Sequence, residues 1–132
     1  MQLTYIVLYV ADVARAAAFY REAFDLTHKF THEGGDYAEM STGPTTLAFC
    51  GHALAEQLMG GAYRRADRAL QPLGCQLTLE PREVAASFER AVRAGAKPIA
   101  APERKPWGFE VAFVQDLDGH VIELARRVDA DT

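Results

Sequence analysis

The order of secondary-structure signals along this chain occurs twice, and this repetition constrains the fold more than any other feature. Apolar and β-branched periodicity predicts a strand, a helix and three more strands at residues 3–10, 13–24, 27–31, 37–41 and 45–50. The same order follows at residues 74–80, 84–92, 97–101, 109–115 and 120–126. Asp12 and Glu83 stand where helix N-caps are expected. The sequence therefore predicts an α+β fold of two tandem strand–helix–three-strand (βαβββ) units.

The two units can be aligned by residue number. At the start of each unit the offset is 71, which places Tyr5 on Gln76. In the last strand the offset is 75, which places Ala48 on Glu123. We expect one domain over the whole chain, divided as a first unit at 1–50, a linker at 51–71 and a second unit at 72–128.

The linker differs in composition from the units that it joins. It contains Gly60-Gly61 with a helical turn expected on each side, and a cluster of arginines that is interpreted as a solvated surface. Flexibility at these glycines would also allow the units to exchange between two copies of the chain. Pro98 and Pro102 flank the short strand at 97–101, which suits only the edge of a sheet.

Charge and composition exclude several classes of function. The net charge is −4 and the isoelectric point is about 5.5, which argues against general affinity for nucleic acid or acidic membranes. No apolar run approaches the ~20 residues that span a bilayer. Two cysteines, Cys50 and Cys75, are too few for a disulfide scaffold, and both are interpreted as packing residues within strands. A reducing cytoplasm is the expected location.

The C-terminal segment carries a more specific pattern. The segment Lys105–Leu124, together with the stretch from Val10 to Tyr20, closely resembles the vicinal-oxygen-chelate superfamily. This superfamily includes glyoxalase I, bleomycin-resistance proteins, extradiol dioxygenases and fosfomycin-resistance proteins. The resemblance covers essentially the whole chain. It implies a mixed sheet curled into a cup, with the helices outside.

Alternation along the strands predicts which side chains face that cup. In the first, fifth and last strands, uniformly apolar residues alternate with a mixed set, and period two puts each set on its own face. The apolar set should pack under the helices. The mixed set should face the cup as a binding surface for a small molecule, and it comprises Tyr5, Tyr9, Gln76, Thr78, Glu80 and Glu123.

Enzymes of this superfamily hold a divalent metal with four strand residues. The resemblance carries those positions onto Tyr5, Ala48, Gln76 and Glu123. Only Glu123 is an ordinary ligand, and a catalytic ion normally needs about three protein ligands. We therefore expect no metal cofactor; if a divalent metal binds, Gln76 and Glu123 would hold it. Without a metal, Glu123 should have a raised pKa or a hydrogen-bond partner such as Tyr5 or Gln76.

Two further residues are candidates for the binding site. His52 ends the fourth predicted strand and is placed at the rim of the cup, with a purely structural role as the alternative. Trp107 lies between a proline and a glycine, and it is either a stacking residue over a ligand or a packed core anchor. The motif Asp116-x-Asp118-Gly119 resembles the start of a calcium loop, but the later ligands are missing, so a hairpin turn is predicted.

Three functions are consistent with these residues. The first is metal-free sequestration of a small aromatic or cationic molecule by a homodimer, as in the bleomycin-resistance branch that the chain resembles. The second is a glyoxalase-type lyase or isomerase, or a dioxygenase, in which Glu123 would be the catalytic residue. The third is a diverged subunit or interaction module.

Overall fold

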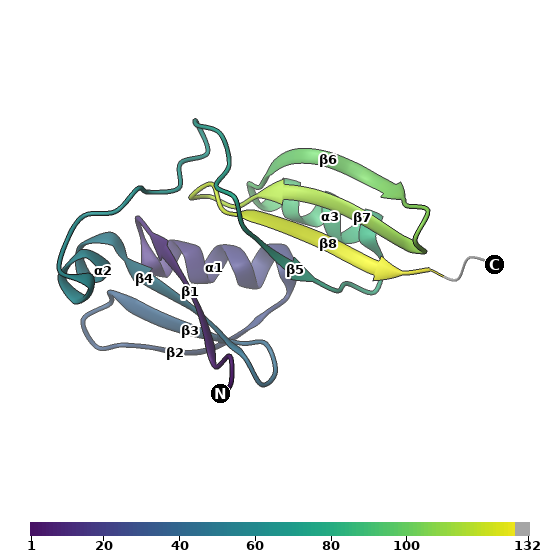
Figure 1. Ribbon diagram of the computed structural model, residues 1–132. Coiled ribbons are helices and arrows are strands. Elements are labelled where there is room, and N and C mark those ends of the chain that lie inside the picture. The colour runs from purple at the N-terminus through teal and green to yellow at the C-terminus, as the bar shows by residue number, and fades with distance from the viewer. Residues whose placement is uncertain (129–132) are drawn as a thin grey trace. The chain divides into compact units, whose positions relative to one another are not determined.

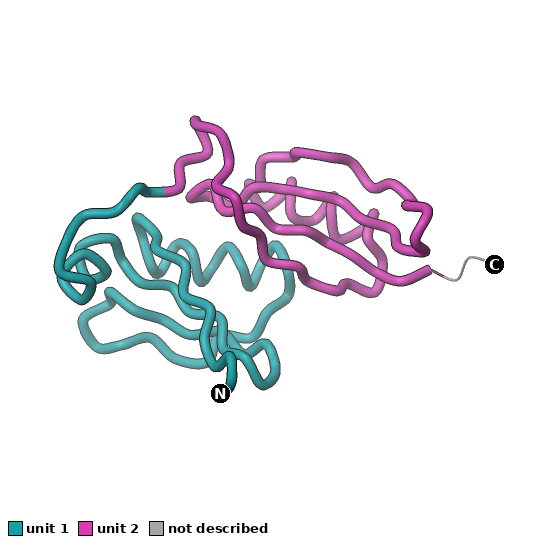
Figure 2. Tube along the Cα trace, in the orientation of Figure 1, with its two compact units in different colours: residues 1–65 teal, residues 66–132 magenta. Residues whose placement is uncertain are grey.

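The computed structural model describes residues 1–128 and shows an α+β fold of eight strands and three helices within them (Figure 1). The elements are, in order, β1 (Tyr5–Val10), α1 (Val13–Phe24), β2 (Thr27–Thr31), β3 (Tyr37–Ser41), β4 (Thr46–Gly51), α2 (His52–Met59), β5 (Gln76–Leu79), α3 (Val84–Ala94), β6 (Lys97–Arg104), β7 (Phe109–Gln115) and β8 (Val121–Arg127). Contacts divide the chain into two compact units, unit 1 from Met1 to Arg65 and unit 2 from Ala66 onward (Figure 2).

Each unit contains one four-stranded mixed sheet. The strand order is β1-β4-β3-β2 in unit 1 and β5-β8-β7-β6 in unit 2. In both, the first and last strands run parallel and the other neighbours run antiparallel. Tyr5 pairs with Thr46, and Gln76 pairs with Val121, so the pairs are related by the offsets of 71 and 75. The predicted α+β fold of two βαβββ units is confirmed, and the parallel pairs β1–β4 and β5–β8 have equivalent registers.

The helix boundaries follow from local chemistry. The Asp12 side chain accepts a hydrogen bond of 3.0 Å from the Arg15 backbone N–H, as expected of an N-cap. Glu83 occupies the N-cap position of α3, but its side chain makes no capping hydrogen bond. Gly95 ends α3 with φ of 118°, a conformation that glycine adopts without steric cost.

One face of each sheet packs against a helix. In unit 1 the ring of Tyr20 on α1 lies 4.8 Å from the ring of Phe49 on β4. In unit 2 α3 contacts β6, β7 and β8, and Ile122 and Leu124 of β8 are buried. The predicted apolar set therefore lies on the helix side. We call the opposite face, which points away from α1 or α3, the distal face of each unit.

The segment predicted as a linker contains regular structure at one end only. Helix α2 begins at His52 and ends at Met59, directly before Gly60-Gly61, whereas residues 62–67 form no helix. Further on, Lys97 donates a hydrogen bond of 3.1 Å to the Arg68 carbonyl within unit 2. The proposed boundaries at 50/51 and 71/72 stay predictions.

Strand β6 is longer than predicted. It extends from Lys97 to Arg104, with register shifts between Pro98 and Ala100 and between Ala100 and Glu103. As the sequence predicted, its two prolines lie in an edge strand, because β6 is the last strand in the order of the unit 2 sheet as described. No helix in the described part of the chain is long and apolar enough to cross a membrane.

Candidate functional site

Glu123 lies on the distal face of unit 2 and accepts two hydrogen bonds. The parallel register of β5 and β8 places Thr78 directly beside Glu123. The Thr78 hydroxyl donates to Glu123 Oε1 at 2.8 Å, and the Gln76 amide Nε2 donates to the same oxygen at 3.1 Å. Gln76 Nε2 also lies 3.1 Å from the Thr78 hydroxyl oxygen. The expected hydrogen bond between Glu123 and Gln76 is therefore confirmed, and Thr78 is added to it.

This arrangement orients the Glu123 carboxylate. Both donors hold Oε1, and the described residues donate no hydrogen bond to Oε2. Phe113 of β7 pairs with Glu123 from the other side and is half-buried. Glu123 thus presents a carboxylate oxygen beside an aromatic ring, which is an arrangement that suits a cation or a hydrogen-bond donor.

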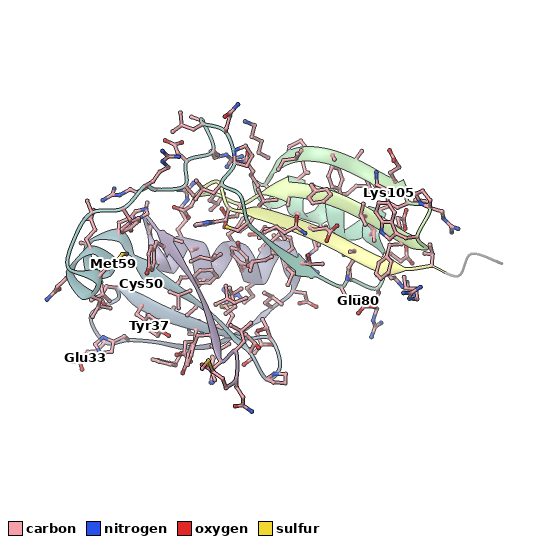
Figure 3. All side chains as sticks on the ribbon, in the orientation of Figure 1. Glu33, Tyr37, Cys50, Met59, Glu80 and Lys105 are labelled. Atoms are coloured by element: carbon pink, nitrogen blue, oxygen red, sulfur yellow. The ribbon has the colours of Figure 1, made fainter. Side chains whose placement is uncertain are left out.

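Two other predicted residues of unit 2 lie outside this hydrogen-bonded group. Glu80 is exposed and follows the end of β5, as Figure 3 shows. Trp107 is 65% exposed in the turn between β6 and β7, so the core-anchor interpretation is wrong. Asp116 is buried and its Oδ1 accepts hydrogen bonds from the backbone N–H groups of Asp118 and His120, both at 2.9 Å, which confirms the hairpin turn.

The remaining predicted residues belong to unit 1. Tyr5 is 47% exposed on β1, and Ala48 of β4 is fully buried. Tyr9 packs its ring 4.8 Å from that of Tyr63. His52 is the first residue of α2 rather than the last of a strand, and its Nδ1 is hydrogen-bonded to the Tyr63 hydroxyl. Burial raises the pKa of Tyr63.

The sequence analysis missed a buried carboxylate in unit 1. Glu39 of β3 pairs with Ala48 of β4 and is only 5% exposed. The Tyr37 hydroxyl donates to Glu39 Oε2 at 2.8 Å, and Lys29 Nζ lies 3.6 Å from Oε1. Burial, and then the hydrogen bond to the Glu39 carboxylate, raise the pKa of Tyr37 well above its ordinary range. Alternation along β3 puts Glu39 on the face opposite Ala38 and Met40, which is the signal that could have found it, but nothing in the sequence indicates its partners.

The four positions at which the family's enzymes hold a metal carry few donor atoms in this chain. Gln76 donates to Glu123 through its amide nitrogen, so it could offer a metal only its neutral carbonyl oxygen, and Ala48 has no donor atom. The described residues contain no group of three or more His, Cys, Asp and Glu side chains suited to a metal ion. One carboxylate with neutral neighbours is a weak donor set for a divalent cation.

A surface hollow of about 660 Å³ lies elsewhere in unit 1. Its lining combines the first residues of α1 and α2 with polar side chains, namely Asp12, Asp36, His52, Gln57 and Arg65. Of these residues, only His52 was predicted from the sequence to belong to a binding site. Arg65 is already paired with Glu56 at 3.6 Å.

The two cysteines differ in environment and should differ in reactivity. Cys50 is 3% exposed, and burial followed by the nearby Asp36 charge raises the pKa of its thiol. Cys75 is exposed and precedes β5, so its interpretation as a packing residue within a strand is wrong. At pH 8 we expect one thiol to react rapidly with Ellman's reagent and the second only after unfolding, since the thiolate is the nucleophile. Rapid reaction of the one remaining thiol in the folded Cys75→Ser variant would contradict this placement of Cys50.

Comparisons with known proteins agree on one family. Residues 2–124 match the family model described as Glyoxalase/Bleomycin resistance protein/Dioxygenase superfamily. No curated protein matches the chain. Among solved structures, a glyoxalase-related enzyme from Fulvimarina pelagi is similar with a TM-score of 0.83 and 26% identity, over 95% of this chain and 87% of that one.

Two other solved structures show the same fold at lower identity. A glyoxalase/bleomycin resistance protein/dioxygenase family enzyme from Burkholderia phytofirmans PsJN has a TM-score of 0.82 and 20% identity, over 97% of this chain and 100% of that one. TioX from Micromonospora sp. ML1 has a TM-score of 0.70 and 21% identity, over 97% and 100% of the two chains.

Proposed function

This chain belongs to the Glyoxalase/Bleomycin resistance protein/Dioxygenase superfamily, and from that premise we propose that it binds a small aromatic or cationic molecule without a metal ion. The observation that carries the proposal is the Glu123 carboxylate, held through Oε1 by Thr78 and Gln76 on the distal face of unit 2. We expect the Oε2 atom of Glu123 to accept a hydrogen bond from the ligand or to pair with its positive charge.

The chemistry of the face supports a cation with an apolar body. A carboxylate that is already oriented by two donors loses little conformational freedom when it binds a charged group. Phe113 beside it supplies an aromatic surface for the body of the ligand. Charge-assisted hydrogen bonds are stronger than neutral ones, so most of the selectivity should come from the carboxylate.

Catalysis is the second function that the family implies, with Glu123 as general base in a lyase, isomerase or dioxygenase. A base that removes a proton from carbon needs a metal ion or another group that stabilises the resulting anion. Around Glu123 the structure offers the Thr78 hydroxyl and the Gln76 amide, and both already donate to Glu123 itself. Sequestration therefore has the stronger support. A homodimer in the cytoplasm remains part of the proposal.

Isothermal titration with 9-aminoacridinium, a planar cation, tests this proposal. We expect Glu123→Gln to weaken binding about 10- to 100-fold, which is the change in affinity that the loss of a hydrogen bond to a charged group usually causes. Glu83→Gln is the matched control, because it removes the same charge from an exposed residue without a side-chain capping bond. Equal affinity of the Glu123→Gln variant and the control would overturn the proposed site.

Metal binding is measured on the same protein. Elemental analysis and titration with zinc, nickel, manganese and iron(II) should show no stoichiometric binding at micromolar concentration. Stoichiometric binding that is lost in Glu123→Gln would reject metal-free sequestration and favour the enzyme.

A further inference from the structure

A small hollow lies between α1 and β2 in unit 1. It measures about 180 Å³, and its lining combines three alanines of α1 with three polar side chains, namely Ala14, Ala17, Ala18, Arg21, His28 and Thr31. We propose that this hollow binds the carboxylate group of a small organic acid through Arg21. The inference goes beyond the proposed function, because it concerns an anion on the helix side of unit 1 and does not need Glu123.

A β-bulge in β2 turns two of these polar side chains toward the helix. On a regular strand, side chains three residues apart point to opposite faces. The pairing of β2 with β3 shifts between His28 and Phe30, so that His28 pairs with Met40 and Thr31 pairs with Ala38. Met40 and Ala38 are fully buried on β3, which contacts α1.

The bulge thus builds a polar edge for the hollow. His28 and Thr31 share the helix side, and the His28 Nε2 atom lies 2.7 Å from the Thr31 hydroxyl oxygen. The extra residue, Lys29, lies on the distal side with Glu39, at a distance of 3.6 Å. Bulges redirect side chains in this way and are frequent beside functional sites.

Arg21 supplies the positive charge of the hollow. The three alanines precede Arg21 by seven, four and three residues, which places all four side chains along one side of α1. Among the residues that the structure describes, none forms an ion pair or a hydrogen bond with the Arg21 side chain. Nor does any carboxylate belong to the described lining. The five N–H donors of this guanidinium are therefore available to an oxyanion, which can bind through two parallel hydrogen bonds.

The fold itself requires neither the alanines nor the arginine. The offset of 71 between the units places Phe88 of α3 at the position of Ala17, and Val92 at the position of Arg21. Phe88 and Val92 are half-buried, so the corresponding side of α3 carries larger apolar side chains. Unit 1 thus has small residues and a cation where unit 2 has apolar bulk.

The charge and the size of the hollow define the class of ligand. One guanidinium balances one carboxylate, whereas a phosphate group would bring a second negative charge. The methyl groups of the alanines offer an apolar surface to a compact body such as a phenyl ring. For so small a ligand we expect a dissociation constant of about 1 mM.

The test is a titration of the full, isotope-labelled chain with benzoate, followed by heteronuclear NMR, with benzamide as the uncharged comparison. We expect benzoate to shift the amide signals of Ala18 and Thr31, and benzamide to leave them in place. Arg21→Gln should weaken benzoate binding about 10-fold or more, because it removes a charge-assisted hydrogen bond.

Arg15→Gln is the matched control for this loss of charge. Arg15 is exposed on the same helix and does not line the hollow, so its substitution should leave benzoate binding unchanged. Equal affinities of Arg21→Gln and Arg15→Gln for benzoate would overturn the proposal.

A second variant separates binding in the hollow from general attraction to an arginine. Ala18 is exposed on α1, and leucine is a good helix former, so Ala18→Leu should fold normally while it fills the hollow. We expect benzoate binding about 10-fold weaker, although Arg21 is still present. Unchanged binding in this variant would reject the hollow as the site.

Two further titrations define the ligand class and separate this site from the proposed function. Inorganic phosphate should bind more weakly than benzoate, and equal or tighter binding would overturn the assignment to a carboxylate. Glu123→Gln should weaken 9-aminoacridinium binding and leave benzoate binding unchanged. Loss of benzoate binding in Glu123→Gln would reject the second site, whereas failure of the acridinium experiment alone would reject only the proposed function.

Discussion

Phe49→Ala is expected to lower the free energy of unfolding of unit 1 by about 3–5 kcal/mol, the range for removal of a fully buried phenylalanine. Phe49 has no exposed surface, and its ring packs against that of Tyr20 on α1. The variant loses the free energy gained by removing the ring from water. It also loses the van der Waals contacts of the residues that would line the resulting cavity. Urea denaturation followed by far-ultraviolet circular dichroism measures the change.

Leu58→Ala is the control for this experiment. Leu58 lies on α2 and is 75% exposed, so its truncation should change stability by no more than about 0.5 kcal/mol. A loss below about 1 kcal/mol in Phe49→Ala would show that the helix α1 does not pack on the sheet as described.

Gly119→Ala is expected to destabilise unit 2 by about 3 kcal/mol, because two separate costs add. Gly119 has φ of 96°, a conformation that disfavours any residue with a Cβ. A Cβ there would also lie 2.6 Å from the backbone nitrogen of Arg68 and from the carbonyl carbon of Asp67. Backbone atoms cannot move aside as a flexible side chain does, so the 67–68 segment would be displaced from the β7–β8 turn.

Substitution of two other glycines distinguishes the cost of the positive φ from the cost of the close backbone contact. Gly35 has φ of 77° with open space around its Cβ position, so Gly35→Ala should cost only the conformational part, about 1–2 kcal/mol. Gly74 has neither a positive φ nor a close neighbour, and Gly74→Ala should change stability by less than about 1 kcal/mol. Equal effects of Gly119→Ala and Gly35→Ala in urea denaturation would disprove the contact with residues 67–68.

The two carboxylates change the interpretation of the duplicated fold. By its register, position 48 of unit 1 is equivalent to position 123 of unit 2, and considered alone this strand of unit 1 has an alanine where unit 2 has a carboxylate. The structure shows a carboxylate one strand away, because Glu39 pairs with Ala48. A carboxylate therefore lies on the distal face of both units, on β3 in unit 1 and on β8 in unit 2.

The sequence was sufficient for several features that depend on local signals. Alternation with period two identified the faces of β1, β5 and β8, and the side-chain cap at Asp12 was predicted from the residue that precedes an amphipathic helix. For Trp107 the sequence left two interpretations open, and its 65% exposure excludes only the packed core anchor, since the apolar character of a side chain does not determine its burial.

The repeated order of elements was determined by the sequence alone, because strand and helix periodicity depend on neighbours within a few residues. The tertiary structure alone decided which polar groups meet. The bond from Thr78 to Glu123 joins residues 45 positions apart, and it exists only because β5 and β8 pair in one register. The contact between Lys29 and Glu39 likewise depends on a bulge in β2 that no local pattern indicates.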